Sequence, residues 1–191
     1  LTGDLTHFGD PPDAFRVVDA VRQFCPSVLA VTGNLDMPWT IEALRLLRRA
    51  GYQLFVITNQ AGIARGYFDE AFVESVHRHL GDRFAAAGAP VDAFYYCPHH
   101  PEATLPAYRL VCECRKPRPG MLHRAAYDLT LDLSRSWMIG DALSDLQAGK
   151  AANAQTLLVL TGRGQEQKKL HRLKDGYPDL AAALEHIRLN G

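Results

Sequence analysis

Short apolar runs alternate along this chain with segments whose apolar residues recur at helical spacing. The runs predict strands at residues 27–32, 53–58, 93–96, 137–140 and 156–160. The other segments predict helices at residues 41–50, 70–87, 121–129, 143–152 and 180–189. Alternating strands and helices with short connections predict an α/β fold, with a doubly wound, Rossmann-like parallel sheet and helices on both of its faces.

Polar residues follow most of the expected strands, at the edge where an open parallel sheet binds its ligands. They read TNQ after the second run, CPHH after the third, GDALSD after the fourth and TGRG after the last. The polar segment 162–176, GRGQEQKKLHRLKDG, is typical of a solvated mobile loop or a frayed helix. The strand ends are therefore where we expect the chemistry.

Size and charge narrow the class of protein. The chain has 191 residues, 47% of them hydrophobic, which is enough for one globular unit with its own core. Lysine plus arginine equals aspartate plus glutamate at 21 each, so no overall field draws the chain to nucleic acid or to a membrane. We find no apolar run of membrane-spanning length and no signal-peptide pattern, and expect a soluble, cytoplasmic protein. Because the sequence opens on Leu1 rather than Met, we expect a cut or processed N-terminus.

Three cysteines and a histidine stand in two pairs at the ends of one proline-containing loop. Cys97 and His99 form a C-x-H pair, and Cys112 and Cys114 form a C-x-C pair. Three thiolates and one imidazole are a full tetrahedral set for zinc, with no position left open, so the pattern predicts a structural zinc that staples the loop. Spacing alone leaves His100 as an alternative to His99. Reduced thiols without metal, or a disulfide, are the other interpretations, and a disulfide is unusual in a cytosolic chain.

Cations and polar groups follow this loop and the second expected strand. The stretch RKPRPG places Arg115, Lys116 and Arg118 directly after the second cysteine pair, where fixed cations suit a phosphorylated ligand. A solvated basic loop is the alternative. Thr58 and Asn59 end the second expected strand and offer a hydroxyl and an amide.

Two carboxylates follow the fourth expected strand. Asp141 stands at the strand end, and Asp145 comes one helical turn later. Carboxylates placed in this way suit a hard divalent cation such as magnesium. The alternative for Asp141 is a helix N-cap, a position that aspartate fills well.

The stretches VITNQAGIARGYF, YYCPHHPE, VCECRKPRPGML and WMIGDALSDLQAGKAAN together resemble the haloacid dehalogenase (HAD) superfamily of phosphatases, from about residue 39 onward. Within it they are similar to the bacterial D-glycero-D-manno-heptose 1,7-bisphosphate phosphatases, with histidinol-phosphate phosphatases as near relatives. The resemblance implies a magnesium-dependent phosphatase acting on the 7-phosphate of a small phosphorylated sugar, a precursor of lipopolysaccharide heptose. It also implies a minimal cap and a monomer.

The resemblance further implies roles for single residues. Thr58 would hydrogen-bond the phosphoryl group, and Lys116 would neutralise the phosphate and the nucleophile. Asp141 would bind magnesium, with Asp145 supporting its loop. The implied substrate contacts are Asn59, Arg65, Arg115 and Lys116, and the implied structural zinc ligands are Cys97, His99, Cys112 and Cys114.

The nucleophile of such a phosphatase comes from a D-x-D motif after the first strand, and this sequence contains no D-x-D. Asp36 follows the expected strand 27–32, but Asn34 stands where the first aspartate would be. Asp36 also lies too close to Thr58 for the usual intervening loop, so it is a weak candidate. The sequence leaves open an enzyme with an unrecognised nucleophile and a catalytically dead, zinc-stabilised phosphosugar-binding module.

Residues 1–38 resemble a different family, the calcineurin-like metallophosphoesterases, of which they look like an internal fragment. In that family Asp4 and Asn34 would ligate a two-metal centre, but the partner motifs of that centre are missing here. We expect residues 1–38 to supply a strand to the phosphatase-like domain formed by residues 39–191. Two incomplete phosphatases joined near Pro38 suggest a fused or rearranged reading frame.

Overall fold

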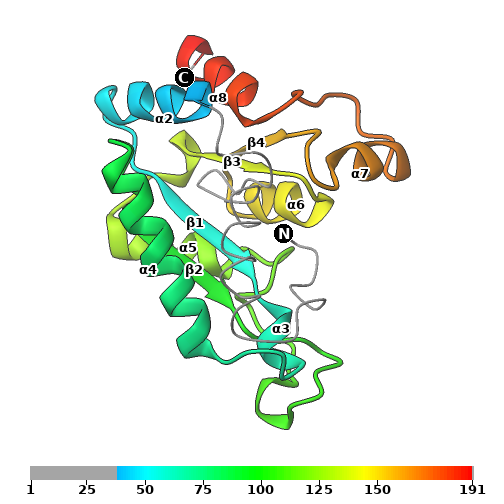
Figure 1. Ribbon diagram of the computed structural model, residues 1–191. Coiled ribbons are helices and arrows are strands. Elements are labelled where there is room, and N and C mark those ends of the chain that lie inside the picture. The colour runs from blue at the N-terminus through cyan, green and yellow to red at the C-terminus, as the bar shows by residue number, and fades with distance from the viewer. Residues whose placement is uncertain (1–37, 191) are drawn as a thin grey trace.

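The computed structural model describes residues 38–190 (Figure 1). The strands are β1 (Phe55–Asn59), β2 (Ala93–Cys97), β3 (Trp137–Gly140) and β4 (Gln155–Leu158). The α-helices are α2 (Pro38–Arg49), α3 (Ala61–Ala64), α4 (Glu70–Ala86), α5 (Gly120–Leu129), α6 (Leu143–Ala151), α7 (Gly164–Leu170) and α8 (Leu180–Asn190), and the 3-10 turns are η2 (Pro106–Tyr108) and η3 (Leu133–Arg135). The expected strand 27–32 and the candidates Asp4, Asn34 and Asp36 lie outside the described residues.

The described strands form two parallel pairs. β1 pairs with β2, in a register that places Asn59 opposite Cys97. β3 pairs with β4, in a register that places Gly140 opposite Leu158. Parallel strands connected through helices confirm the α/β class, and parallel pairing places the carboxyl ends of both strands of a pair at the same edge.

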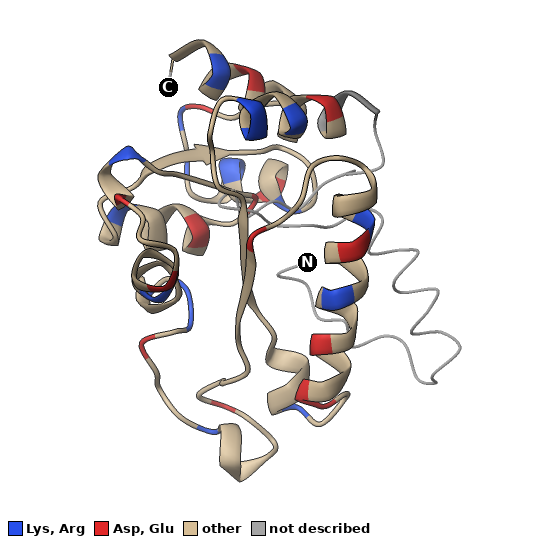
Figure 2. Ribbon diagram, turned by 90° about the vertical axis from the view of Figure 1, so that its left-hand side faces the viewer, with Lys and Arg blue, Asp and Glu red and all other residues tan. Residues whose placement is uncertain are grey.

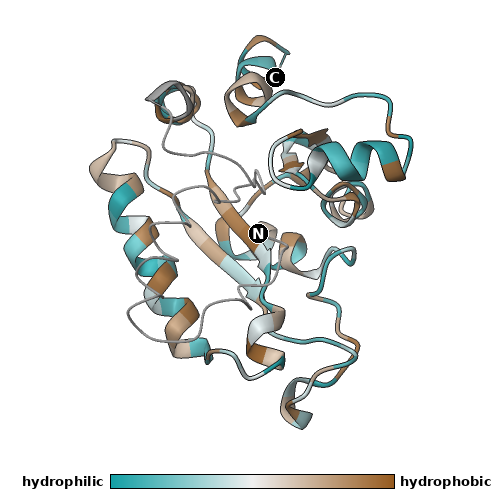
Figure 3. Cartoon of the chain, turned by 45° about the vertical axis from the view of Figure 1, so that its right-hand side comes forward, coloured by the Kyte–Doolittle hydropathy of each residue, from teal (hydrophilic) through white to brown (hydrophobic). Residues whose placement is uncertain are grey.

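Helices cover these strand pairs. α6 packs on β3 and β4, α5 packs on β1 and β2, and α2 packs against α8 (Figure 1). The strands and the inward faces of the helices are apolar, whereas α7 is largely hydrophilic (Figure 3). One core cluster contains Ile57 of β1, Ile139 of β3 and Leu184 of α8, each with no exposed surface. Both strand pairs therefore contribute to one core, where each such side chain contributes about 1.5–3 kcal/mol of burial free energy.

Charged residues of both signs are distributed over the surface (Figure 2). Helix α4, for example, carries acidic and basic residues along its length. This mixture agrees with the equal numbers of acidic and basic residues in the sequence. None of the described helices is both long and apolar enough to cross a membrane.

The segment 162–176 differs from the solvated surface expected of it. It contains α7, in which Gly164 and Gln167 are buried. The side-chain carbonyl of Gln167 accepts a hydrogen bond of 3.2 Å from the amide of Leu143, at the start of α6. The solvated interpretation is therefore wrong at these two positions, because one face of α7 packs beside the loop that follows β3.

Candidate active site and zinc centre

Several of the predicted site residues lie at strand ends or directly after them. Thr58 and Asn59 are the last residues of β1. Cys97 ends β2, and Asp141 follows the last residue of β3. The contacts of Lys116 link the end of β1 to the first turn of α6.

Lys116 is only 5% exposed and is held at both its backbone and its ammonium group. Its amide donates to Asn59 Oδ1 over 3.0 Å, and its carbonyl accepts from Asn59 Nδ2 over 3.1 Å. Its Nζ donates to the carbonyl of Ile57 over 3.1 Å and lies 2.7 Å from Asp145 Oδ1. A buried ammonium is tolerated because it is both paired and hydrogen-bonded.

The two carboxylates after β3 have different surroundings. Asp145 Oδ2 accepts a hydrogen bond of 3.1 Å from the amide of Ala142, the N-cap residue of α6. Asp141 Oδ2 accepts one of 2.8 Å from the amide of Arg163. Asp141 is therefore not the N-cap, and that alternative is wrong. Gly140 is required beside them, since a Cβ at this position would collide with the Asp145 side chain.

Asp141 Oδ1 is buried and has no hydrogen-bond partner among the described residues. An orphaned carboxylate oxygen is costly unless a cation compensates it. Carboxylate oxygen is also the ligand that magnesium prefers. The environment of Asp141 thus fits a magnesium ligand. Asp145 Oδ1 also has no hydrogen-bond partner among the described residues, but it is paired with the ammonium of Lys116 over 2.7 Å, and Asp145 Oδ2 accepts from the amide of Ala142.

Thr58 is 6% exposed at the end of β1. Its hydroxyl oxygen accepts a hydrogen bond of 3.2 Å from Gln60 Nε2. Since a hydroxyl both donates and accepts, its proton can be directed at a bound oxyanion while this contact is kept.

Arg65 and Arg115 are close enough to influence each other electrostatically. Arg65 is the C-cap residue of α3. Arg115 is half-buried and donates to the carbonyl of His99 over 2.9 Å. Burial lowers the pKa of Arg115, and the positive charge of Arg65 acts in the same direction. Burial lowers the pKa of His100, and the positive charges of Arg115 and Arg65 act in the same direction. An anion bound beside these cations would relieve their mutual repulsion.

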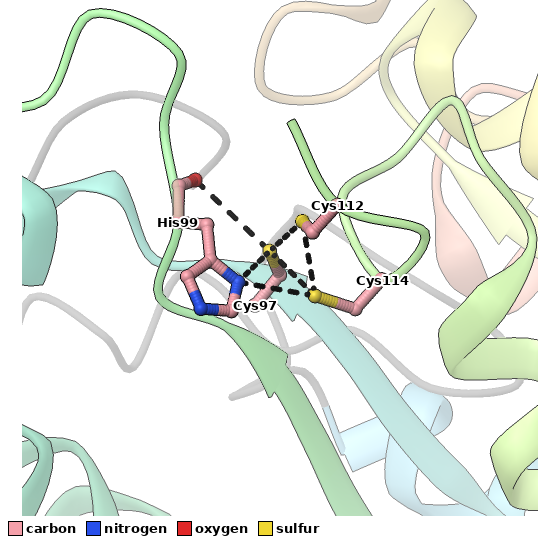
Figure 4. A group of neighbouring side chains, drawn as sticks. All are labelled: Cys97, His99, Cys112 and Cys114. Atoms are coloured by element: carbon pink, nitrogen blue, oxygen red, sulfur yellow. Dashed lines mark hydrogen bonds between the residues drawn. The ribbon is translucent and has the colours of Figure 1, made fainter. Parts of the chain in front are cut away.

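The structure brings together the four predicted zinc ligands, whose donor atoms lie within 4.8 Å of one another (Figure 4). The sulfurs of Cys97, Cys112 and Cys114 are 3.0–3.4 Å apart. His99 Nδ1 lies 3.4 Å from the sulfur of Cys114 and 3.8 Å from that of Cys97. Donors bound to one tetrahedral zinc at about 2.0–2.3 Å would be separated by about 3.5–3.8 Å, so small shifts complete the site.

The choice between the two histidines is decided by geometry. The ring of His99 faces the three sulfurs, whereas His100 Nδ1 accepts a hydrogen bond of 3.1 Å from the amide of Glu102. Cys97, Cys112 and Cys114 are free thiols, so the disulfide interpretation is wrong for them.

Sequence analysis missed two polar residues near these sites. Gln167 supports the start of α6, and Glu70 accepts hydrogen bonds from two tyrosines of other segments. The only sequence signal for Glu70 was its place in the first turn of α4, after the N-cap residue Asp69. Gln167 had none, since it lies within a charged run.

The chain is similar to characterised proteins over most of the described part. Residues 113–183 match a family model described as HAD-hydrolase-like. The chain is 49% identical, over 74% of its own length and 79% of the relative's, to the D-glycero-beta-D-manno-heptose-1,7-bisphosphate 7-phosphatase of Rhodopseudomonas palustris. It is 48% identical to the Salmonella typhi protein of the same name, over 64% of its own length and 66% of that protein.

A solved structure shares the fold. The D,D-heptose 1,7-bisphosphate phosphatase from B. bronchiseptica, complexed with magnesium and phosphate, superposes with a TM-score of 0.69 at 35% identity. The match covers 81% of this chain and 84% of that one. With the identity to the R. palustris protein, it shows that the chain belongs to the HAD-like hydrolases, in the family of the D-glycero-beta-D-manno-heptose-1,7-bisphosphate 7-phosphatases.

Proposed function

We propose that this protein is a magnesium-dependent phosphatase that removes the 7-phosphate of D-glycero-β-D-manno-heptose 1,7-bisphosphate. The observation that carries the proposal is Lys116, whose buried ammonium links β1 to the carboxylate of Asp145 in the first turn of α6. The names of the relatives and the magnesium and phosphate bound in the B. bronchiseptica structure support the choice of reaction.

In this proposal Lys116 and Thr58 bind the phosphoryl group that is transferred. Among the described residues Lys116 Nζ contacts Ile57 and Asp145, and an ammonium has three protons, so one is available for a phosphate oxygen. The hydroxyl of Thr58 donates to a second oxygen. Asn59 orients the site, because its amide holds both main-chain groups of Lys116.

Asp141 would hold magnesium through Oδ1, while the amide of Arg163 fixes its other oxygen. When bound, magnesium supplies positive charge that reduces the repulsion between phosphate and an attacking carboxylate. Asp145 holds the ammonium of Lys116 in place by acting as its counter-ion.

The substrate carries two phosphates, and Arg65 and Arg115 supply further positive charge for it. The guanidinium of Arg115 is tied to the carbonyl of His99, so the zinc loop fixes its position. Fixed guanidinium groups suit phosphate oxygens because their planar fork can donate two parallel hydrogen bonds.

No nucleophile is identified for this site among the residues that the structure describes. The sequence has no D-x-D, and Asp36, our candidate, lies outside the described residues. Losing a covalent nucleophile typically lowers kcat by several powers of ten. This favours, as a second candidate function, a catalytically dead, zinc-stabilised module that binds the phosphosugar.

We propose further that residues 39–191 form the phosphatase domain, that residues 1–38 are a phosphoesterase-like segment supplying one strand, and that the protein is a cytoplasmic monomer. Light scattering after size-exclusion chromatography tests the monomer. Sequencing across the codons around Pro38 in the source DNA tests the junction, and a continuous reading frame that recurs in related genomes would contradict a rearrangement.

The experiment that tests the function is phosphate release from heptose 1,7-bisphosphate in the presence of magnesium, with histidinol phosphate assayed in parallel. We expect turnover of the bisphosphate to exceed that of histidinol phosphate, and ³¹P NMR to show loss of the 7-phosphate. Saturable binding without turnover would instead support the dead module. Neither binding nor turnover would contradict both functions.

A further inference from the structure

The loop between the two pairs of zinc ligands has a second attachment, made by Glu70 at the start of α4. Glu70 Oε1 accepts a hydrogen bond of 2.8 Å from the hydroxyl of Tyr108, which lies in η2 in the middle of the loop. Its other oxygen, Oε2, accepts one of 2.8 Å from the hydroxyl of Tyr96 on β2. One carboxylate thus joins the zinc loop to the strand from which the loop departs.

Glu70 is a firm point of attachment because its helix is well anchored. The N-cap residue Asp69 accepts a hydrogen bond of 2.8 Å from the amide of Phe72. Val73 and Phe84 bury the inner face of α4. In the loop, Leu105, Leu110 and Val111 are exposed, while Ala103 is buried and the amide of Leu105 donates to the carbonyl of Ala64.

Tyr108 transmits this attachment to the zinc centre. Its ring lies beside that of His99, with centroids 6.2 Å apart and planes at 43°. Its carbonyl accepts a hydrogen bond of 3.0 Å from the amide of His100. Tyr108 therefore contacts the ligand His99 and the residue that follows it, and Glu70 fixes the position of Tyr108.

We propose that Glu70 is a positioning residue of the zinc centre, which slows the loss of zinc by holding Tyr108, and through it His99, in the ligating arrangement. Zinc leaves a closed four-ligand site only when the loop opens locally and one ligand swings away. A contact that exists in the closed loop and is lost on opening lowers the population of the open form. Groups behind the ligands commonly change metal affinity by about 10–100-fold.

The two tyrosines supply a matched pair of variants. Tyr108→Phe keeps the ring beside His99 and removes the hydrogen bond between the loop and Glu70. Tyr96→Phe removes the hydrogen bond that strand β2 makes with the same carboxylate. The measurement is the rate of zinc release from the purified holoprotein into an excess of a chromophoric chelator. We expect Tyr108→Phe and Glu70→Gln to release zinc at least about 5-fold faster, and Tyr96→Phe to stay within about 2-fold of the unsubstituted protein.

Melting temperatures of the zinc-loaded proteins show whether a faster release of zinc merely reflects a less stable fold. Each variant removes one hydrogen bond to Glu70, and Tyr96→Phe also removes the longer contact of 3.5 Å with Glu74. A purely structural role would therefore make Tyr96→Phe release zinc at least as fast as Tyr108→Phe. Equal rates for the two variants, or a Glu70→Gln protein that releases zinc like the unsubstituted one, would overturn the proposal. Because zinc release is measured without substrate, the result does not depend on phosphatase activity.

Discussion

Asn59 and Lys116 form a reciprocal pair, in which the Asn59 side chain both accepts from the main-chain amide of Lys116 and donates to its carbonyl, over 3.0 and 3.1 Å. The two residues are 57 positions apart in the sequence. This pair fixes the segment after the zinc loop to the carboxyl end of β1, and the ammonium of Lys116 lies beside the carboxylate of Asp145.

Replacing Asn59 should therefore loosen this junction. Asn59→Ala leaves a donor and an acceptor of Lys116 without partners, and we expect the free energy of unfolding to fall by about 1–3 kcal/mol. Urea denaturation measures it, with Asn190→Ala at the exposed end of α8 as the control, expected to change by less than about 0.5 kcal/mol. A similar loss in both variants would contradict the role given to Asn59.

The buried ion pair between Lys116 and Asp145 should behave cooperatively. Lys116→Met leaves the carboxylate of Asp145 buried without a cation. We expect a loss of about 3–5 kcal/mol. Adding Asp145→Leu should restore part of this stability, because the uncompensated charge is removed. Losses that simply add in the double variant would show that the two residues do not interact.

Zinc content tests the four-ligand centre. Freshly purified protein should contain one zinc per chain by elemental analysis, and Cys112→Ser should lower this content and the melting temperature. Cys25→Ser is the control, since Cys25 belongs to neither ligand pair, and it should retain one zinc. Clearly less than one zinc in the unsubstituted protein, or equal zinc content in both variants, would contradict the four-ligand zinc centre.

His77 should make stability depend on pH. Its ring stacks on Phe94 with centroids 5.0 Å apart, and burial lowers its pKa to about 4. Between an unfolded value of about 6.5 and this value, the unfolded chain binds a proton that the folded chain does not. The unprotonated ring of His77 therefore costs the fold nothing above about pH 6.5, and the free energy of unfolding declines as the pH falls toward 4.

The comparison of His77→Phe with the unsubstituted protein isolates this effect. The difference in unfolding free energy between the two proteins should change between pH 4.5 and 7, by about 1–3 kcal/mol. His79→Gln, at an exposed position of the same helix, should leave the pH dependence unaltered. A difference between His77→Phe and the unsubstituted protein that stays constant with pH would mean that His77 titrates normally.

Local sequence patterns predicted the features that depend on local spacing. Alternating runs predicted four of the described strands, although β1 continues to Asn59 and β4 covers Gln155–Leu158 rather than residues 156–160. The two ligand pairs were visible because zinc ligands come in short, recognisable spacings. The order of the strand-end motifs also carried the family resemblance.

The features that sequence could not supply depend on the direction in which side chains point. Spacing alone did not choose between His99 and His100, whereas the turn after β2 directs the ring of His99 at the sulfurs. Glu70 meets Tyr108 from 38 residues away, and Gln167 reaches Leu143 from 24. Such partners are brought together by tertiary packing, so no sequence pattern within either segment predicts their contact.

The central claim, a phosphatase site at the end of β1, is tested most directly at Thr58. Thr58→Val keeps the shape of this side chain and removes the hydroxyl, which accepts a hydrogen bond from the side chain of Gln60 within the described part of the chain. Thr156→Val on β4 is the matched control. If heptose 1,7-bisphosphate and magnesium give measurable phosphate release, Thr58→Val should lower kcat/KM by about 10²-fold or more at an unchanged melting temperature, and Thr156→Val should not. Equal release by Thr58→Val and the unsubstituted protein would contradict the account.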